Sequence, residues 1–157
     1  MDLFPVKKST TALTGKFLID SNVLIYATQS LDSRHSKSLE ILEWGRHSKS
    51  KAYISVQNLA EMYPVLTGPK SIPPDSPEIA RQKIESIASL PHLEIIPITW
   101  SIVTKALELC QRHRIERQKY FDMQLVAMML LHEIPTIVTE NENDFSSIAD
   151  IHVFHPF

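Results

Sequence analysis

The fold is decided by the stretch Phe17-Leu18-Ile19-Asp20-Ser21-Asn22-Val23-Leu24-Ile25-Tyr26. The apolar residues 17–19 predict a short buried strand that ends at Asp20. Ser21 or Asn22 can cap the helix that the next apolar residues begin. A carboxylate at this junction lies at the carboxyl edge of a sheet, where open α/β folds bind their ligands. Helix capping alone explains Asp20 equally well, so its role depends on where the other acids fall.

Length and composition indicate one globular domain. The chain has 157 residues, of which 43% are apolar and 22% charged, and these are ordinary values for a folded domain. The net charge of −2 does not indicate a simple DNA-binding protein, although an acidic active site would mask basic residues elsewhere. The single cysteine, Cys110, excludes an intrachain disulfide. With neither a transmembrane run nor a signal peptide in the sequence, we expect a cytoplasmic protein.

Short apolar runs alternate with longer amphipathic segments along the chain. The predicted strands are 17–19, 52–55, 93–96, 136–139 and 151–154. The predicted helices are a short one after Asp20, then 33–45, 56–66, 78–90, 100–112 and 120–132. This alternation predicts an α/β fold, a three-layer α/β/α sandwich with a mostly parallel central sheet. We expect residues 1–15 to form an N-terminal extension and residues 16–157 to form a single domain.

Two of the predicted helices carry apolar residues at helical spacing. In the helix 56–66, the residues expected to face the core are Val56, Leu59, Ala60, Tyr63 and Leu66. In the helix 100–112, they are Trp100, Val103, Leu107 and Cys110. Glu61 lies beside the first of these faces. Because acids are seldom buried without a reason, Glu61 is a candidate functional residue.

Acidic residues recur near the ends of the predicted strands and at the starts of helices. Asp20 follows the first strand, Asp122 lies in the first turn of the helix 120–132, and the run 140–144 follows the fourth strand. Each has a structural explanation, since the helix dipole favours Asp122 and the run 140–144 can be a solvated turn. Together with Glu61, however, they predict several carboxylates at one edge of the sheet.

Carboxylates gathered in one place repel one another and stay ionised only when cations are present. Oxygen ligands without clustered Cys or His favour Mg²⁺ or Mn²⁺ over zinc. A cation held in this way suits chemistry on phosphates, because it polarises a phosphodiester oxygen and favours the ionisation of an attacking water.

Four segments resemble the four motifs of the PIN domain family, in the family's order. They are residues 18–26, Asn58-Leu59-Ala60-Glu61, residues 120–127 and residues 136–145. The resemblance covers residues 16–157, and the compact size is similar to that of the VapC-type toxin ribonucleases of bacterial toxin–antitoxin pairs. It implies a metal-dependent endoribonuclease that binds Mg²⁺ or Mn²⁺, is blocked by a small antitoxin protein and forms a homodimer.

The resemblance also implies roles for individual residues. The catalytic, metal-binding acids would be Asp20, Glu61 and Asp122. Many members carry an Asp where this chain has Asn141, so the fourth ligand is either Asn141, through its carbonyl oxygen, or Asp144. The residues implied to orient these acids are Ser21, Asn22 and Thr139.

A cluster of basic residues precedes Asp122. Arg112, Arg114, Arg117 and Lys119 are candidates for holding RNA phosphates, and the alternative is a solvated basic loop. A second function hypothesis is a catalytically weak or inactive PIN-like module that binds RNA or protein, which Asn141 would suit. A haloacid-dehalogenase-type phosphatase is disfavoured, because its second Asp would stand where this chain has Asn22.

Overall fold

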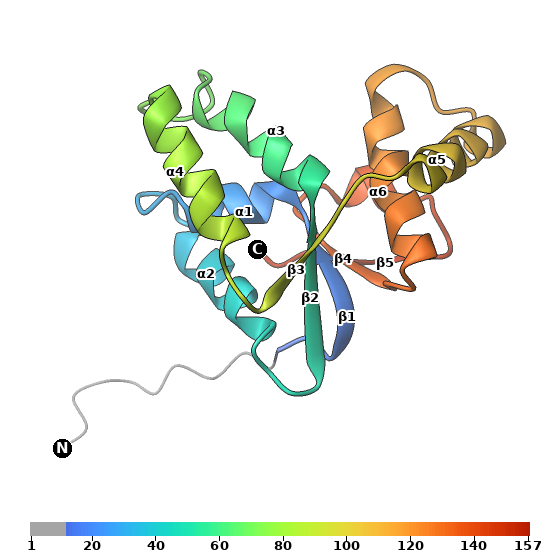
Figure 1. The fold of residues 1–157 in the computed structure, drawn as a ribbon, viewed down its shortest axis with the longest axis horizontal. Helices are drawn as coiled ribbons and strands as arrows, with labels where there is room; N and C mark the ends of the chain where they lie inside the picture. The colour runs from blue at the N-terminus through green and yellow to red at the C-terminus, as the bar shows by residue number, and fades with distance from the viewer. Residues whose placement is uncertain (1–11) are drawn as a thin grey trace.

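A computed structural model describes residues 12–157, which form a sheet of five parallel strands (Figure 1). The strands are β1 (Gly15–Ile19), β2 (Ser50–Ser55), β3 (Leu93–Ile96), β4 (Thr136–Val138) and β5 (His152–Phe154). Their order in the sheet is β3-β2-β1-β4-β5, and every neighbouring pair is parallel. The predicted α/β fold is therefore confirmed, with β1 at the centre of the sheet.

Helices cover both faces of this sheet. On one side lie α1 (Ser21–Ala27), α2 (His35–Trp44), α3 (Val56–Leu66) and α4 (Pro77–Ala88); on the other lie α5 (Trp100–His113) and α6 (Tyr120–Leu131) (Figure 1). A 3₁₀ turn, η1 (Arg117–Lys119), leads into α6, and a short helix, α7 (Glu142–Phe145), follows β4. Because side chains alternate along a strand, β1 sends Phe17 and Ile19 into the first hydrophobic core and Leu18 into the second.

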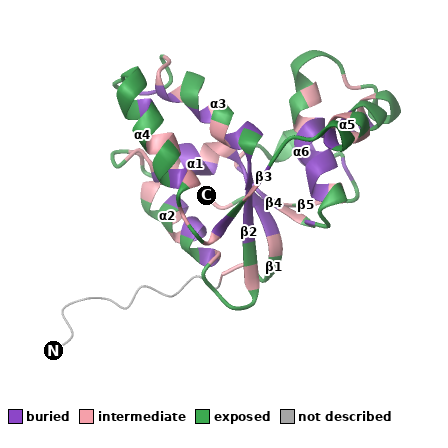
Figure 2. Ribbon diagram, viewed as in Figure 1, coloured by how far each residue is buried: buried purple, intermediate pink, exposed green. Residues whose placement is uncertain are grey.

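The helix α6 is buried around most of its circumference (Figure 2). Its buried residues run without a break from Met123 to Met129, because α6 lies between the sheet and α5. A helix that is apolar all round belongs in the middle of a domain. This position fixes the start of α6, and with it Asp122, near the carboxyl ends of the strands.

The predicted buried faces of two helices were only partly right, because Leu66 is buried and Leu59 and Cys110 pack against the cores while other predicted residues are exposed. In α3, Val56 and Tyr63 are exposed by 42% and 43%, and the buried residues include the polar Gln57 and Asn58. Ser55 and Asn58 form a capping box that turns this polar side inward, where both amides find partners. In α5, Trp100 and Leu107 are exposed.

The buried face of α5 is instead formed by Ile102, Ala106 and Leu109. This stripe also has helical spacing, and the small Ala106 lets α5 lie close to α6. Cys110 is only partly buried at the border of the second core, and burial raises the pKa of its thiol.

The N-terminal end of the described chain packs against the domain. Ala12 and Leu13 contact the first core, and Ser50 donates a hydrogen bond from its hydroxyl to the carbonyl of Leu13. Residues 1–11 of the predicted extension lie outside the described residues, so the division at residue 15 stays a prediction. Within residues 12–157, no helix is both long and apolar enough to span a membrane.

Candidate active site

Asp20 lies at the carboxyl end of the central strand and is only 5% exposed. Its Oδ1 accepts hydrogen bonds from the Ser21 backbone N–H at 2.7 Å and from Asn58 Nδ2 at 3.3 Å. Its Oδ2 accepts from Thr139 Oγ1 at 2.7 Å and from Asn22 Nδ2 at 3.2 Å. Asp20 thus does cap α1, and it is also held in one orientation by residues from three other places in the chain.

These hydrogen bonds do not fully compensate Asp20 for its burial. Burial raises its pKa to about 6, although the hydrogen bonds from Thr139 and Ser21 act in the opposite direction. The charge of Glu61 raises the pKa further. A buried carboxylate with a raised pKa gains free energy from any cation that comes near it.

Asp122 lies in the first turn of α6 and is partly buried. Burial raises its pKa to about 7, and the charges of Asp144, Asp20 and Glu61 add to this effect in that order. Lys119 opposes the shift. The predicted acids therefore lie within electrostatic reach of one another, and Asp144 acts on Asp122 more strongly than the other two.

Glu61 is positioned by a chain of amide side chains that joins α3 to α6. Gln57 Nε2 donates to Glu61 Oε1 at 2.7 Å and to the carbonyl of Phe121 at 3.0 Å. Gln124 Nε2 donates to Gln57 Oε1 at 2.7 Å, and Gln124 Oε1 accepts from the Tyr120 hydroxyl at 2.9 Å. The helix that carries Glu61 is thereby tied to the helix that carries Asp122.

The segment after β4 brings the fourth group of polar residues to the site. Thr139 is fully buried, and its hydroxyl accepts a hydrogen bond from the Asn141 backbone N–H at 3.0 Å. The acidic run does not form a simple turn, because Phe145 is buried in the second core and holds α7 in place. Asp144 is carried by this helix, whereas the exposed Asn141 precedes it. The predicted fourth ligand is one of these two residues, and the effect of Asp144 on the pKa of Asp122 favours Asp144.

A second group of acids lies next to the first and contains its own cation. Arg34 Nη1 donates to Glu140 Oε1 at 2.7 Å and to the Tyr26 hydroxyl at 2.8 Å, and Arg34 Nε donates to Asp32 Oδ1 at 2.9 Å. The Arg34 guanidinium also lies over the Tyr26 ring, 3.6 Å from its centroid. The Glu140 backbone N–H donates to Asn22 Oδ1 at 3.2 Å, which connects this group to the candidate site.

Sequence reasoning missed several of these residues. Asn58, Gln57 and Gln124 are amides on helix faces. The one sequence feature that could have indicated their burial is a polar residue beside an apolar stripe. Arg34 and Glu140 are 106 residues apart in the sequence, so their pairing leaves no local pattern.

The predicted basic residues lie at the other side of the site and point into solvent. They are Arg112, Arg114, Arg117 and Lys119, and all four are exposed. The backbone is left-handed at Arg114 and at Arg117, where φ is 54° and 58°. Within residues 12–157 none of the four takes part in an ion pair, so their charges are available.

The acids of the candidate site also have no basic partner within the described part of the chain. Nor do any three His, Cys, Asp or Glu side chains, as they are placed in residues 12–157, form a group that could hold a metal ion. The donors themselves suit a hard divalent cation, because they are carboxylate oxygens whose charges raise the pKa values of Asp20 and Asp122. The residues that could hold such an ion are Asp20, Glu61, Asp122 and Asp144, with Asn141 as a neutral oxygen donor.

The fold and the position of the acids define a class of protein. It is an α/β/α sandwich with a group of carboxylates at the carboxyl ends of its parallel strands. Comparison with protein families makes the assignment specific. The model of the PIN domain family matches residues 17–151, and the chain belongs to this family. The four motif-like segments were therefore a correct basis for recognising it.

Solved structures of similar fold come from toxin–antitoxin systems. A chain of a toxin–antitoxin complex from Klebsiella pneumoniae is 22% identical, with a TM-score of 0.58 over 89% of this chain and 97% of that chain. VapC20 of Mycobacterium tuberculosis, described as a sarcin–ricin loop cleaving toxin, is 17% identical, with a TM-score of 0.64 over 86% of this chain and 96% of that chain.

A chain of VapBC2 from Rickettsia felis, solved with a DNA fragment from its promoter, is 20% identical to this chain. Its TM-score is 0.63, and the match covers 88% of this chain and 96% of that chain. At these identities, the similarity establishes the shared fold. A comparison with curated protein sequences found no match.

Proposed function

We propose that this protein is a metal-dependent endoribonuclease, the toxin of a toxin–antitoxin pair. The observation that carries the proposal is the set of acids at the carboxyl edge of the sheet, which have no basic partner among the described residues and within which neighbouring carboxylates raise the pKa values of Asp20 and Asp122. Membership of the PIN domain family and the likeness to VapC20, a toxin described as cleaving the sarcin–ricin loop, support nuclease chemistry at this place.

In this proposal, the acids Asp20, Glu61, Asp122 and Asp144 hold Mg²⁺ or Mn²⁺, with Asn141 as the other candidate for the fourth position. The cation supplies charge neutralisation and Lewis acidity at the phosphodiester group. Thr139 and Asn22 fix the orientation of the Asp20 carboxylate, and Ser21 fixes its second oxygen. Held in this way, Asp20 needs no reorientation when the substrate arrives.

The exposed residues Arg112, Arg114, Arg117 and Lys119 supply positive charge, which would attract RNA phosphates to a site that is otherwise acidic. They lie directly before Asp122 and would contact phosphates of the substrate. Arg114→Ala should therefore weaken RNA binding more at low salt than at high salt. Equal RNA binding by the variant and the wild type at every salt concentration would show that this segment is a solvated surface.

The partners follow from the same likeness. The Klebsiella pneumoniae and Rickettsia felis chains were solved as parts of toxin–antitoxin complexes, and we propose a small antitoxin as the partner of this chain as well. A homodimer and a cytoplasmic location belong to the same proposal, and the single cysteine suits a reducing compartment.

Cleavage of a mixed RNA pool in the presence of Mn²⁺ tests the enzyme. The wild type should cut the pool, and a chelator should stop it. Asp122→Asn keeps the size of the side chain but removes one charge, and it should lower the cleavage rate at least 10- to 100-fold, since changes in residues that merely support metal ligands already cost about that much. Cleavage that survives both the chelator and the mutation would contradict the proposal.

A binding module without catalysis is the second candidate. It is favoured by one observation, namely that the side chains of residues 12–157 form no ready-made group of three metal ligands. In the same experiment, a wild type that binds RNA but leaves it intact at every Mn²⁺ concentration would support this second function.

A further inference from the structure

A cavity of about 400 Å³ opens beside the candidate active site. On the side of the acids it is lined by Ser21, Asn22 and Asn141, the residues that flank Asp20 and Thr139. Its far side is lined by Tyr26, Arg34 and Lys70. The cavity therefore leads directly away from the acids and has the size of a small-molecule site.

The acids in this cavity wall are neutralised within the protein. Asp32 and Glu140 line it, and both are paired with Arg34. The side chains of Ile25 and Val65 add apolar surface, and Gln29 Nε2 donates to Ser71 Oγ at 3.0 Å. Apolar surface with amide and hydroxyl groups suits a nucleobase and ribose, which are uncharged.

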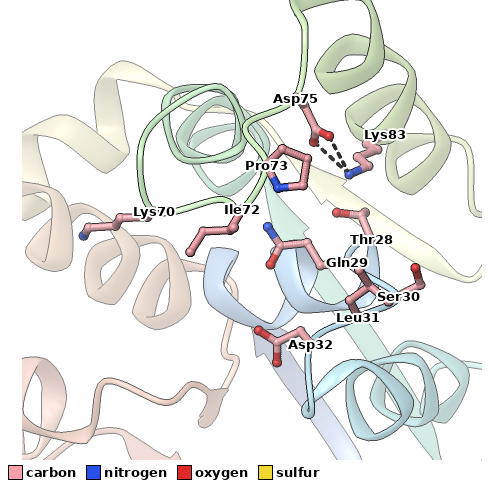
Figure 3. A pocket seen from close by; sticks show the side chains of 10 residues that line it. All are labelled: Thr28, Gln29, Ser30, Leu31, Asp32, Lys70, Ile72, Pro73, Asp75 and Lys83. Atoms are coloured by element: carbon pink, nitrogen blue, oxygen red, sulfur yellow. Dashed lines mark hydrogen bonds and ion pairs between the residues drawn. The ribbon is translucent and has the colours of Figure 1, made fainter.

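Lys70 is the cation left available at the end of this cavity. It is exposed and has no hydrogen-bond or ion-pair partner within residues 12–157, whereas Lys83 nearby is paired with Asp75 at 2.7 Å. Figure 3 shows the Lys70 side chain extending away from that pair. An exposed lysine in this position can bind a phosphate without breaking an existing interaction.

A second cavity, of about 440 Å³, continues beyond Lys70 (Figure 3). The two cavities share Gln29, Asp32 and Lys70 in their linings, so they adjoin each other and together are called the groove. Leu31 and Ile72 line the second cavity and are 93% and 90% exposed. These side chains offer apolar surface to a base that is splayed out of a single strand.

We propose that this groove is the exit path for single-stranded RNA. The nucleotide next to the scissile phosphate occupies the first cavity, and Lys70 binds the following phosphate. This inference rests on the proposed function, because it assumes that RNA reaches the acids. The loop that carries Lys70 and the basic segment before α6 lie on opposite sides of the carboxyl ends of the strands (Figure 1), so the strand is held on both sides of the cut.

The first experiment measures binding of a short fluorescein-labelled single-stranded RNA in EDTA, where no cleavage interferes. Lys70→Ala should weaken binding about fivefold near 0.1 M salt and reduce the slope of log K against log salt by about 0.7, as expected for one lost phosphate contact on a single strand. Lys70→Arg should keep the wild-type values. Lys49→Ala is the matched control, because Lys49 is exposed and lies beside the start of β1, at the opposite edge of the sheet.

A second experiment locates the RNA directly. The same RNA carrying 4-thiouridine is cross-linked by ultraviolet light, and the attached peptides are identified by mass spectrometry. Cross-links should fall within residues 21–29 and 65–72. Cross-links confined to α5, η1 and α6, or Lys70→Ala binding equal to the wild type, would overturn the proposal, and the latter is also the result expected if the groove serves a protein partner.

Failure of this inference and failure of the proposed function are distinguishable. If the wild type cuts RNA with Mn²⁺ but Lys70→Ala binds RNA like the wild type, the exit path is wrong and the nuclease stands. If Lys70→Ala loses binding while the wild type never cuts RNA, the path is right and the protein is a binding module.

Discussion

Two groups of acids lie side by side at the same edge of the sheet, and they differ in how their charge is balanced. Asp32 and Glu140 are held by Arg34, which is paired with both. Asp20 and Asp122 form no ion pair in the described chain, and the largest effects of neighbouring charges on their pKa values come from other carboxylates. The first group is complete as the chain folds, whereas the second is stable in its ionised form only when a cation comes from outside.

The pKa of Asp32 is lowered, whereas the pKa values of Asp20 and Asp122 are raised. Hydrogen bonds from Arg34 lower the pKa of Asp32, and the pKa of Arg34 is raised mainly by the bond to Asp32. Burial raises the pKa of Asp20 to about 6 and that of Asp122 to about 7. Acids of the same type, in the same part of the molecule, are therefore balanced by an arginine in one group and, among the described residues, left without a cation in the other.

The largest expected difference between the groups is in catalysis. Asp20→Asn should lower Mn²⁺-dependent RNA cleavage at least 10- to 100-fold, because it removes a charge from the proposed ion site. Glu140→Gln should lower the rate far less, since the amide oxygen can keep the bond from Arg34 and only the acceptor for the Tyr26 hydroxyl is lost. Initial rates on one RNA substrate give the comparison, and equal losses in the two variants would remove the distinction between the groups.

The second difference is in the response to metal. Mn²⁺ or Mg²⁺ at a hundred times its Kd should stabilise the wild type by about 2.7 kcal/mol, or roughly 5–10 °C in Tm. Asp122→Asn should show a smaller rise, and Glu140→Gln should respond like the wild type. Thermal unfolding with and without EDTA measures the effect. An equal rise in all three proteins would place the ion elsewhere.

The third difference is in stability without metal. Arg34→Ala leaves Asp32 and Glu140 without their shared donor and should reduce the free energy of unfolding by about 1–3 kcal/mol. The matched control is Arg81→Ala, which breaks an exposed pair with Glu85 and should cost less than about 1 kcal/mol. Urea denaturation compares the two. A loss no greater in Arg34→Ala than in the control would show that the paired group does not stabilise the fold.

The smallest effect is in the pH dependence of stability in EDTA. Because the pKa values of Asp20 and Asp122 are higher in the folded protein than the ordinary 3.8, the folded state binds protons more tightly. The resulting stability is complete below about pH 4 and is lost as the pH rises through about 6 and 7. Asp122→Asn should flatten this decline by roughly 1 kcal/mol, after allowance for solvent screening of a partly exposed group. If the Tm of the wild type in EDTA is unchanged between mildly acidic and mildly alkaline pH, the predicted loss of stability with rising pH is wrong.

The sequence predicted the strands and helices well, and also their order along the chain. Alternating apolar runs and helical segments identified all five strands, because parallel strands are buried on both faces and must be apolar. The inward faces of α3 and α5 were assigned only partly correctly, since Leu66 is buried but Val56, Tyr63, Trp100 and Leu107 are exposed. Periodicity alone does not show whether Asn58 finds a partner inside, and here that partner is Asp20, 38 residues away.

The candidate site was predicted in part. Position after a strand identified Asp20, and position at a helix start identified Asp122, because both are local features. The amides that hold Glu61 and the arginine that neutralises Glu140 depend on contacts between distant segments. Such contacts form where side chains of α3 and α6 meet at the edge of the sheet, and where the turn before α2 meets the segment after β4, and no local pattern encodes them.

The central position of β1 has a consequence for synthesis on the ribosome. The hydrogen bond between Asp20 and Thr139 spans 119 residues, so it forms only when nearly the whole chain has been translated. β1 can pair with β2, and β2 with β3, well before then, because those strands are made earlier. Until β4 arrives, the free side of β1 is an open sheet edge, and such edges recruit other chains. An unfinished chain therefore carries an aggregation-prone strand and an Asp20 that lacks one of its orienting partners.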